Sequence, residues 1–163
     1  MIFRFRVSYL NAPEFKREYD VDGEQTLYDL HQFIQADLDY DASQPVLFFT
    51  ANAQWDEESE YSLFGTPSTD PMDAVSVGSL VREHHHRLLY TFDVINDRSL
   101  RLELQEMLEP EPRVRYPRTA TESGAPPLQI GAKGSNPAAS MFDQAMPDFD
   151  ANQYSSSAGG GDD

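Results

Sequence analysis

The chain has 163 residues, no cysteine and a formal net charge of −16. The length fits one domain of roughly 100–150 residues. The lack of cysteine excludes disulfides, thiolate nucleophiles and cysteine-bound zinc, and it fits a reducing compartment. Arginines interrupt the apolar N-terminus, and no window reaches the roughly 18 apolar residues of a membrane span. We therefore expect a cytoplasmic protein without membrane contact.

Alternating apolar side chains predict a β-hairpin at the start of the chain. Residues 3–9 are apolar at every second position, and the alternation resumes over residues 15–21 after a break at Pro13. A period of two residues is typical of a half-buried strand. Asp22 and Gly23 then supply residues that favour a turn.

A helix is predicted next. Thr26 is a candidate N-cap, because Asp29 lies three positions further on, as in a capping box. Apolar residues follow at helical spacing over residues 27–38. The apolar run at residues 46–49 predicts a buried strand, so the elements open in the order strand, strand, helix, strand, which is β-grasp-like.

The following segment, residues 52–73, is acidic and turn-rich, with a brief strand predicted at residues 61–64 and a short helical turn at residues 75–81. Apolar alternation returns over residues 88–94 and 100–104. This pattern predicts a second hairpin.

Together these elements predict an α+β domain over residues 1–127. We expect a mixed β-sheet of about five or six strands packed by one main helix. Residues 128–163 are rich in Gly, Ala, Ser and Asp, and such a segment cannot bury enough apolar surface to offset its ordering entropy. They are predicted to form a disordered acidic tail.

Several motifs of the domain occur in a set order. They are residues 27–35 (LYDLHQFIQ), 88–93 (LLYTFD) with the leucine strand behind it, 116–118 (YPR) and 124–127 (GAPP). This set resembles the plasmid pRiA4b ORF-3-like family. The resemblance implies an α+β protein of bacteria or archaea, in some cases carried on plasmids or insertion elements, and it implies no established activity.

The sequence also departs from the pattern of that family. Members often carry a tryptophan and a histidine after the LLYxFD motif, where this chain has Arg98, Ser99 and Leu100. Their closing segment often contains cysteines, which are missing here. The metal or redox chemistry proposed for such members is therefore not expected, and we predict no cofactor.

Two residues inside these motifs are candidates for a functional pair. His31 lies beside the apolar stripe of the predicted helix, where a histidine is more often a packed core-edge residue than a base. Asp93 lies in an otherwise apolar strand, and a buried carboxylate must find a partner or shift its pKa. A hydrogen-bonded pair of His31 and Asp93 would satisfy both and could serve an enzyme or a metal protein.

A second cluster contains His84 and His86, which share a face if the backbone is extended. With His31 they could form a three-imidazole site for zinc or nickel. The simpler interpretation is an exposed loop between Arg82 and Arg87, and we predict no metal site.

The acidity is concentrated within the predicted domain, because the chain has no Lys or Arg between Arg17 and Arg82. This interval should repel nucleic acid, so no direct DNA or RNA binding is expected. The densest part of this interval consists of Asp56, Glu57, Glu58 and Glu60. It lacks the spacing of a calcium-binding loop and could instead dock a basic partner.

The sequence therefore favours a non-enzymatic interaction module with an acidic surface. Solvation of that surface alone would also explain the charge. A second interpretation is an accessory protein of a plasmid or insertion element that acts near DNA through a partner. The oligomeric state is left open.

Overall fold

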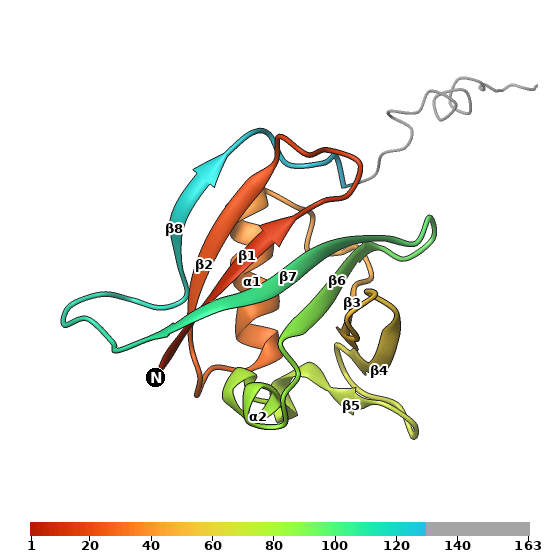
Figure 1. Cartoon of the computed structure of the whole chain (residues 1–163). Coiled ribbons are helices and arrows are strands. Elements are labelled where there is room, and N and C mark those ends of the chain that lie inside the picture. Colours follow the sequence, from red (N-terminus) through yellow and green to blue (C-terminus); the bar gives the residue numbers. More distant parts are fainter. Residues whose placement is uncertain (130–163) are drawn as a thin grey trace, which may run out of the picture. The chain divides into compact units, whose positions relative to one another are not determined.

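The computed structural model describes residues 1–129 (Figure 1). Within it, Met1–Pro126 forms one compact unit. The two α-helices of the described chain are α1 (Leu27–Leu38) and α2 (Val77–Arg82), with a 3-10 turn, η1 (Met72–Ala74), just before α2. The strands are β1 (Ile2–Ser8), β2 (Lys16–Asp22), β3 (Leu47–Ala51), β4 (Glu57–Ser62), β5 (Asp70–Pro71), β6 (Arg87–Asp93), β7 (Arg98–Leu108) and β8 (Arg118–Ser123).

All the strands belong to one sheet in the order β5-β4-β3-β6-β7-β1-β2-β8. Neighbouring strands are antiparallel except for β4 and β5, which are parallel, so the sheet is mixed. The predicted order of β1, β2, α1 and β3 along the chain is confirmed. In the sheet, however, β6 and β7 lie between β1 and β3.

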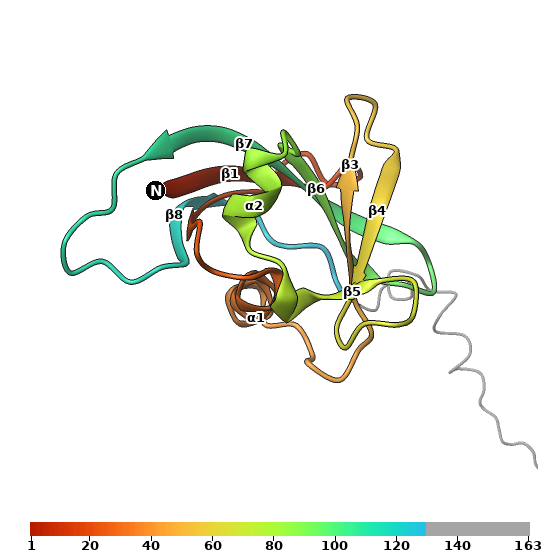
Figure 2. The same ribbon diagram turned by 90° about the horizontal axis from the view of Figure 1, so that it is seen from below.

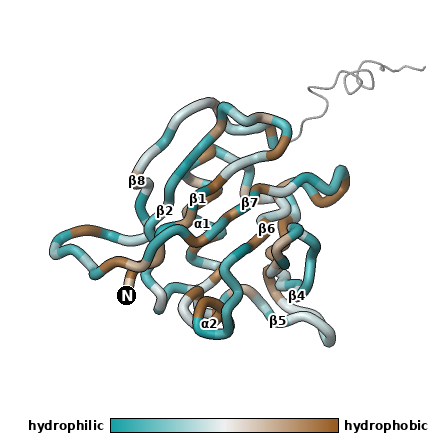
Figure 3. Tube along the Cα trace, viewed as in Figure 1, coloured by the Kyte–Doolittle hydropathy of each residue, from teal (hydrophilic) through white to brown (hydrophobic). Residues whose placement is uncertain are grey.

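The sheet has 8 strands, where five or six were expected. The predicted strand at residues 61–64 is a longer strand, β4, whose residues Glu57–Ser62 are exposed or half-buried and show no apolar alternation. Its trace is hydrophilic in Figure 3. The strand β8 consists of polar residues and one alanine. The two strands without a predicted counterpart are β5 and β8, which hydrophobic periodicity could not reveal, because β5 has only two residues and β8 shows no apolar alternation.

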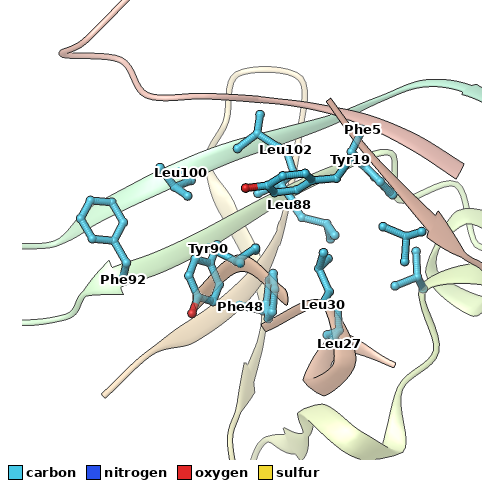
Figure 4. Close-up of a cluster of buried hydrophobic side chains, with 14 of the residues drawn as sticks. Phe5, Tyr19, Leu27, Leu30, Phe48, Leu88, Tyr90, Phe92, Leu100 and Leu102 are labelled. Atoms are coloured by element: carbon cyan, nitrogen blue, oxygen red, sulfur yellow. The ribbon is translucent and has the colours of Figure 1, made fainter. Parts of the chain in front are cut away.

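The hydrophobic core lies between the sheet and the helices. Side chains of α1, η1 and α2 join the same buried cluster as alternate residues of β1, β2, β6 and β7. Figure 2 shows α1 beside the sheet, and Figure 4 shows Leu27 and Leu30 of α1 facing Phe48, Leu88 and Tyr90. All helices of residues 1–129 pack on this face, so the opposite face of the sheet, here called the outer face, carries none.

Polar contacts hold β8 in place. Arg118 Nε donates to Asp20 at 3.0 Å, and the Thr119 hydroxyl donates to Asp37 at 3.0 Å. Arg17 Nη1 donates to the backbone carbonyls of Ser123 and Gly124, at 3.1 Å in both cases. These contacts explain how a strand without an apolar face is fixed to the sheet.

Within residues 1–129, no helix is long and apolar enough to cross a bilayer. The predicted tail lies outside the described residues from position 130 onward.

The predicted capping box is confirmed at the start of α1. Thr26 Oγ1 accepts a hydrogen bond from the Asp29 N–H at 3.1 Å, and the Asp29 carboxylate accepts one from the Thr26 N–H at 2.9 Å. Both contacts satisfy N–H groups that have no partner inside the helix.

We expect Thr26→Ala to lower the free energy of unfolding by about 1 kcal/mol, because the Asp29 N–H loses its acceptor. Thr26→Ser keeps the hydroxyl and should lose much less. Urea denaturation followed by circular dichroism measures both variants. Equal losses would mean that the hydroxyl is not what stabilises the helix.

Candidate functional site

His31 lies on the inner face of α1, where the 3.6-residue period turns it toward the sheet. Its side chain is buried, with 5% of the residue exposed. Its Nδ1 atom lies 2.8 Å from the Tyr90 hydroxyl in a hydrogen-bonded contact. Burial lowers the pKa of His31, so the imidazole is neutral at pH 7. This is the packed core-edge histidine that the simpler interpretation predicted.

Asp93 ends β6 and is held inside its own hairpin. Its carboxylate accepts hydrogen bonds from the Asn96 N–H at 3.2 Å, from Asn96 Nδ2 at 3.0 Å and from Arg98 Nε at 2.9 Å. Burial alone would raise the pKa of Asp93, but the hydrogen bonds and the Arg98 charge bring it below its ordinary value. The carboxylate therefore stays ionised and partnered.

His31 and Asp93 do not form the predicted hydrogen-bonded pair. Each has a partner on a neighbouring element: Tyr90 for His31, and the turn and β7 for Asp93. The prediction rested on the need of two polar side chains for hydrogen-bond partners. The sequence did not show that Asp93 lies opposite Arg98 in the strand register and finds its partner there.

His84 and His86 line a cleft of about 540 Å³ at the start of β6. Their ring centroids are 6.4 Å apart, and His84 has a left-handed backbone conformation with φ 69°. The predicted third ligand, His31, is absent from the cleft lining and bonds to Tyr90 instead. No group of three or more His, Asp or Glu side chains in residues 1–129 is arranged to hold a metal ion.

The predicted acidic cluster lies on and just before β4. Glu57, Glu58 and Glu60 are exposed residues of the strand, whereas Asp56 precedes it and accepts a hydrogen bond from Asn52 Nδ2 at 3.1 Å. Burial, followed by the negative charges of Asp97 and Glu60, raises the pKa of Glu57. The carboxylates therefore produce a negative potential along this strand.

One edge of this acidic strand is open. On one side β4 pairs with β3, and on the other it pairs with β5 only at Tyr61 and Ser62. Within the described residues, no strand pairs with residues 57–60 on the side away from β3, which we call their outer edge. A strand edge of this kind presents unpaired N–H and C=O groups to a possible partner.

A cleft of about 470 Å³ runs beside this edge and is lined by the following residues: Glu58, Ser59, Glu60, Tyr61, Ser68, Thr69 and Asp70. It adds a third carboxylate, that of Asp70, to those of Glu58 and Glu60. The sequence did not link Asp70 to the cluster, because only the loop before β5 brings the two segments together. We call the outer edge of residues 57–60 together with this cleft the acidic edge.

The fold and the acidic edge define an α+β protein with a single mixed sheet, one face of which carries no helix within residues 1–129. The chain belongs to the plasmid pRiA4b ORF-3-like protein family, whose model matches residues 2–153. The predicted family is therefore confirmed.

The fold is also similar to the crystal structure of a protein of unknown function from Methanosarcina mazei Go1. The TM-score is 0.70 at 18% sequence identity, over 88% of this chain and 82% of that chain. At this identity the likeness concerns the fold alone. No curated protein matches the chain.

Proposed function

We propose that this protein is a non-enzymatic interaction module that binds a basic, extended segment of a partner protein along the acidic edge. The observation that carries the proposal is the coincidence of an open strand edge with exposed carboxylates at Glu57, Glu58 and Glu60. The two residues with the most obvious catalytic chemistry, His31 and Asp93, are each engaged in structural hydrogen bonds.

Strand addition explains how such an edge would recognise a peptide. Backbone hydrogen bonds to the open edge provide affinity that is independent of sequence, while the side chains of the edge select the partner. A basic segment would place Lys or Arg beside the carboxylates of β4, and complementary charge mainly adds specificity and association rate.

Charge on an edge strand also prevents unwanted pairing. Two copies of β4 brought edge to edge would place carboxylates against carboxylates, which is unfavourable. The same charges that repel a second copy attract a basic strand. A partner of opposite charge therefore fits this edge better than a second copy of the chain.

A labelled peptide of alternating lysine and valine tests the proposal by fluorescence anisotropy. We expect Glu57→Gln, Glu58→Gln and Glu60→Gln together to weaken binding by about 3- to 150-fold, because three exposed ion pairs at about 0.2–1 kcal/mol each sum to about 0.6–3 kcal/mol. Asp56 is left unchanged, since its side chain holds the turn through Asn52.

The matched control removes three exposed carboxylates elsewhere in the domain, at Glu14, Glu24 and Glu109. This control should bind the peptide nearly as well as the unaltered protein. A peptide with alternate backbone nitrogens methylated should lose affinity if binding extends the sheet. Equal affinities for the two triple variants would overturn the proposal.

A further inference from the structure

The outer face of the sheet carries a second charged surface with the opposite sign. Arg6 of β1 and Arg87 of β6 both lie opposite Glu103 of β7 in the strand register, and Arg101 lies two positions before Glu103. Trp55, from the turn between β3 and β4, lies against Arg87 and Arg101. We call these five residues the arginine–tryptophan patch.

The patch has more positive than negative charge. Arg6 Nη2 and Arg87 Nη2 contact the two oxygens of Glu103 at 3.2 and 3.1 Å. Arg101 forms no ion pair within residues 1–129, and the buried Nε of Arg87 has no hydrogen-bond acceptor there. The patch thus contains three guanidinium groups and one carboxylate, which leaves two positive charges and several N–H donors unmatched.

Trp55 lies within cation–π distance of two of these arginines. The guanidinium carbon of Arg87 lies 5.4 Å from the centroid of the Trp55 ring, and that of Arg101 lies 5.0 Å from it. Both are within the range of cation–π attraction. The stacking limits the freedom of the side chains, so less conformational entropy is lost when a ligand is bound.

The turn that presents Trp55 has an unusual backbone conformation. Trp55 has φ 66°, a left-handed conformation that is unusual for a bulky residue. Asn52 stabilises the turn, because its Oδ1 accepts hydrogen bonds from the N–H groups of Gln54 and Asp56, at 2.9 Å in both cases. These hydrogen bonds keep the turn, and with it the Trp55 ring, in this conformation.

The surroundings of the patch limit the size of a negatively charged ligand that it could bind. The patch extends over β6, β7 and β1, which is two strand spacings or roughly 10 Å. The cleft beside Arg101 contains Asp97, and the cleft beside Arg87 contains Glu58 and Glu83. A long polyanion such as nucleic acid would have to cross these carboxylates, whereas a ligand with two or three negative charges would not.

We propose that the arginine–tryptophan patch binds a short acidic segment of a protein partner. The planar fork of a guanidinium matches a carboxylate in a bidentate contact, and a segment with two or three carboxylates complements the excess positive charge of the patch. The patch adjoins the acidic edge at Glu58, which lines the cleft beside Arg87, but binding of an acidic segment does not use that carboxylate, so the inference does not rest on the function proposed above.

The test uses Trp55, the only tryptophan in the chain, as its reporter. A peptide without tryptophan and with a central run of four glutamates is titrated into the full chain, and tryptophan emission is recorded. We expect Arg101→Gln to weaken binding about tenfold, which corresponds to the loss of one hydrogen-bonded charge contact. Arg101→Lys keeps the positive charge but lacks the planar guanidinium. Its affinity for the peptide should lie between those of the unaltered protein and Arg101→Gln.

The matched control is Arg115→Gln, which removes an exposed arginine outside the patch and should leave peptide affinity unchanged. Removal of the carboxylates of β4 should not weaken binding of the glutamate peptide, which separates this test from that of the acidic edge. The inference would be overturned if Arg101→Gln bound the peptide as tightly as the unaltered protein. Tighter binding of inorganic phosphate or single-stranded DNA than of the peptide would also overturn it.

Discussion

Replacement of Phe48 by alanine will lower the free energy of unfolding by about 3–5 kcal/mol, the range for truncation of a fully buried aromatic residue. Phe48 lies in β3 with 0% of its surface exposed, and its ring centroid is 4.9 Å from that of Tyr90 on the neighbouring strand. Loss of the ring leaves a cavity at the point where β3 and β6 meet α1. Urea denaturation followed by circular dichroism measures the change.

Phe64→Ala is the matched control, because the same side chain is removed from a residue that is 90% exposed. Its effect should stay within about 0.5 kcal/mol. Similar losses in the two variants would contradict the packing of β3 on the core.

Asp20→Asn will destabilise the domain by about 2–3 kcal/mol, because it leaves two arginines without their shared carboxylate. Asp20 is 1% exposed and accepts hydrogen bonds from Arg4 Nε at 2.7 Å, from Arg4 Nη2 at 2.9 Å and from Arg118 Nε at 3.0 Å. The ion pairs join β1, β2 and β8, so β8 should lose protection from amide hydrogen exchange first. Glu109→Gln removes an exposed carboxylate and should have little effect.

The same residue makes stability depend on pH. Burial alone would raise the pKa of Asp20, but the hydrogen bonds and charges of Arg4 and Arg118 lower it below its ordinary value. A carboxylate with a lowered pKa in the folded state stabilises the protein above its unfolded pKa, about 3.9, and this contribution is lost as the pH falls toward the lower, folded value. Acid titration of unfolding should therefore show a smaller decrease for Asp20→Asn than for the unaltered protein.

Most of the buried elements could be predicted from the sequence. The first hairpin, α1 and the second hairpin each bury one apolar face, so the period of their apolar residues identifies them. The capping box at Thr26 and Asp29 was predictable because it depends only on residues three positions apart. These elements are fixed by local pattern and burial together.

The polar parts of the structure were not predictable in the same way. The strand β8 is held by Asp20, Asp37 and Arg17, each more than eighty residues from its contact in β8 or just beyond it, and no local pattern marks such bonds. The pairing of His31 with Tyr90 depends on the placement of α1 across β6. Trp55 packs against a separate small cluster that contains Phe49 and Leu89, and no local sequence pattern marks this contact.

The place of β1 in the sheet has a consequence for folding during synthesis. The partner of β1 at one edge, β2, follows directly in the chain, whereas its partner at the other edge, β7, follows much later, since Ile2 lies opposite Leu108. Contacts of such long sequence separation slow folding. Until most of the domain has been synthesised, the open edge of β1, with Phe3, Phe5 and Val7, is a segment that a nascent-chain chaperone would have reason to shield.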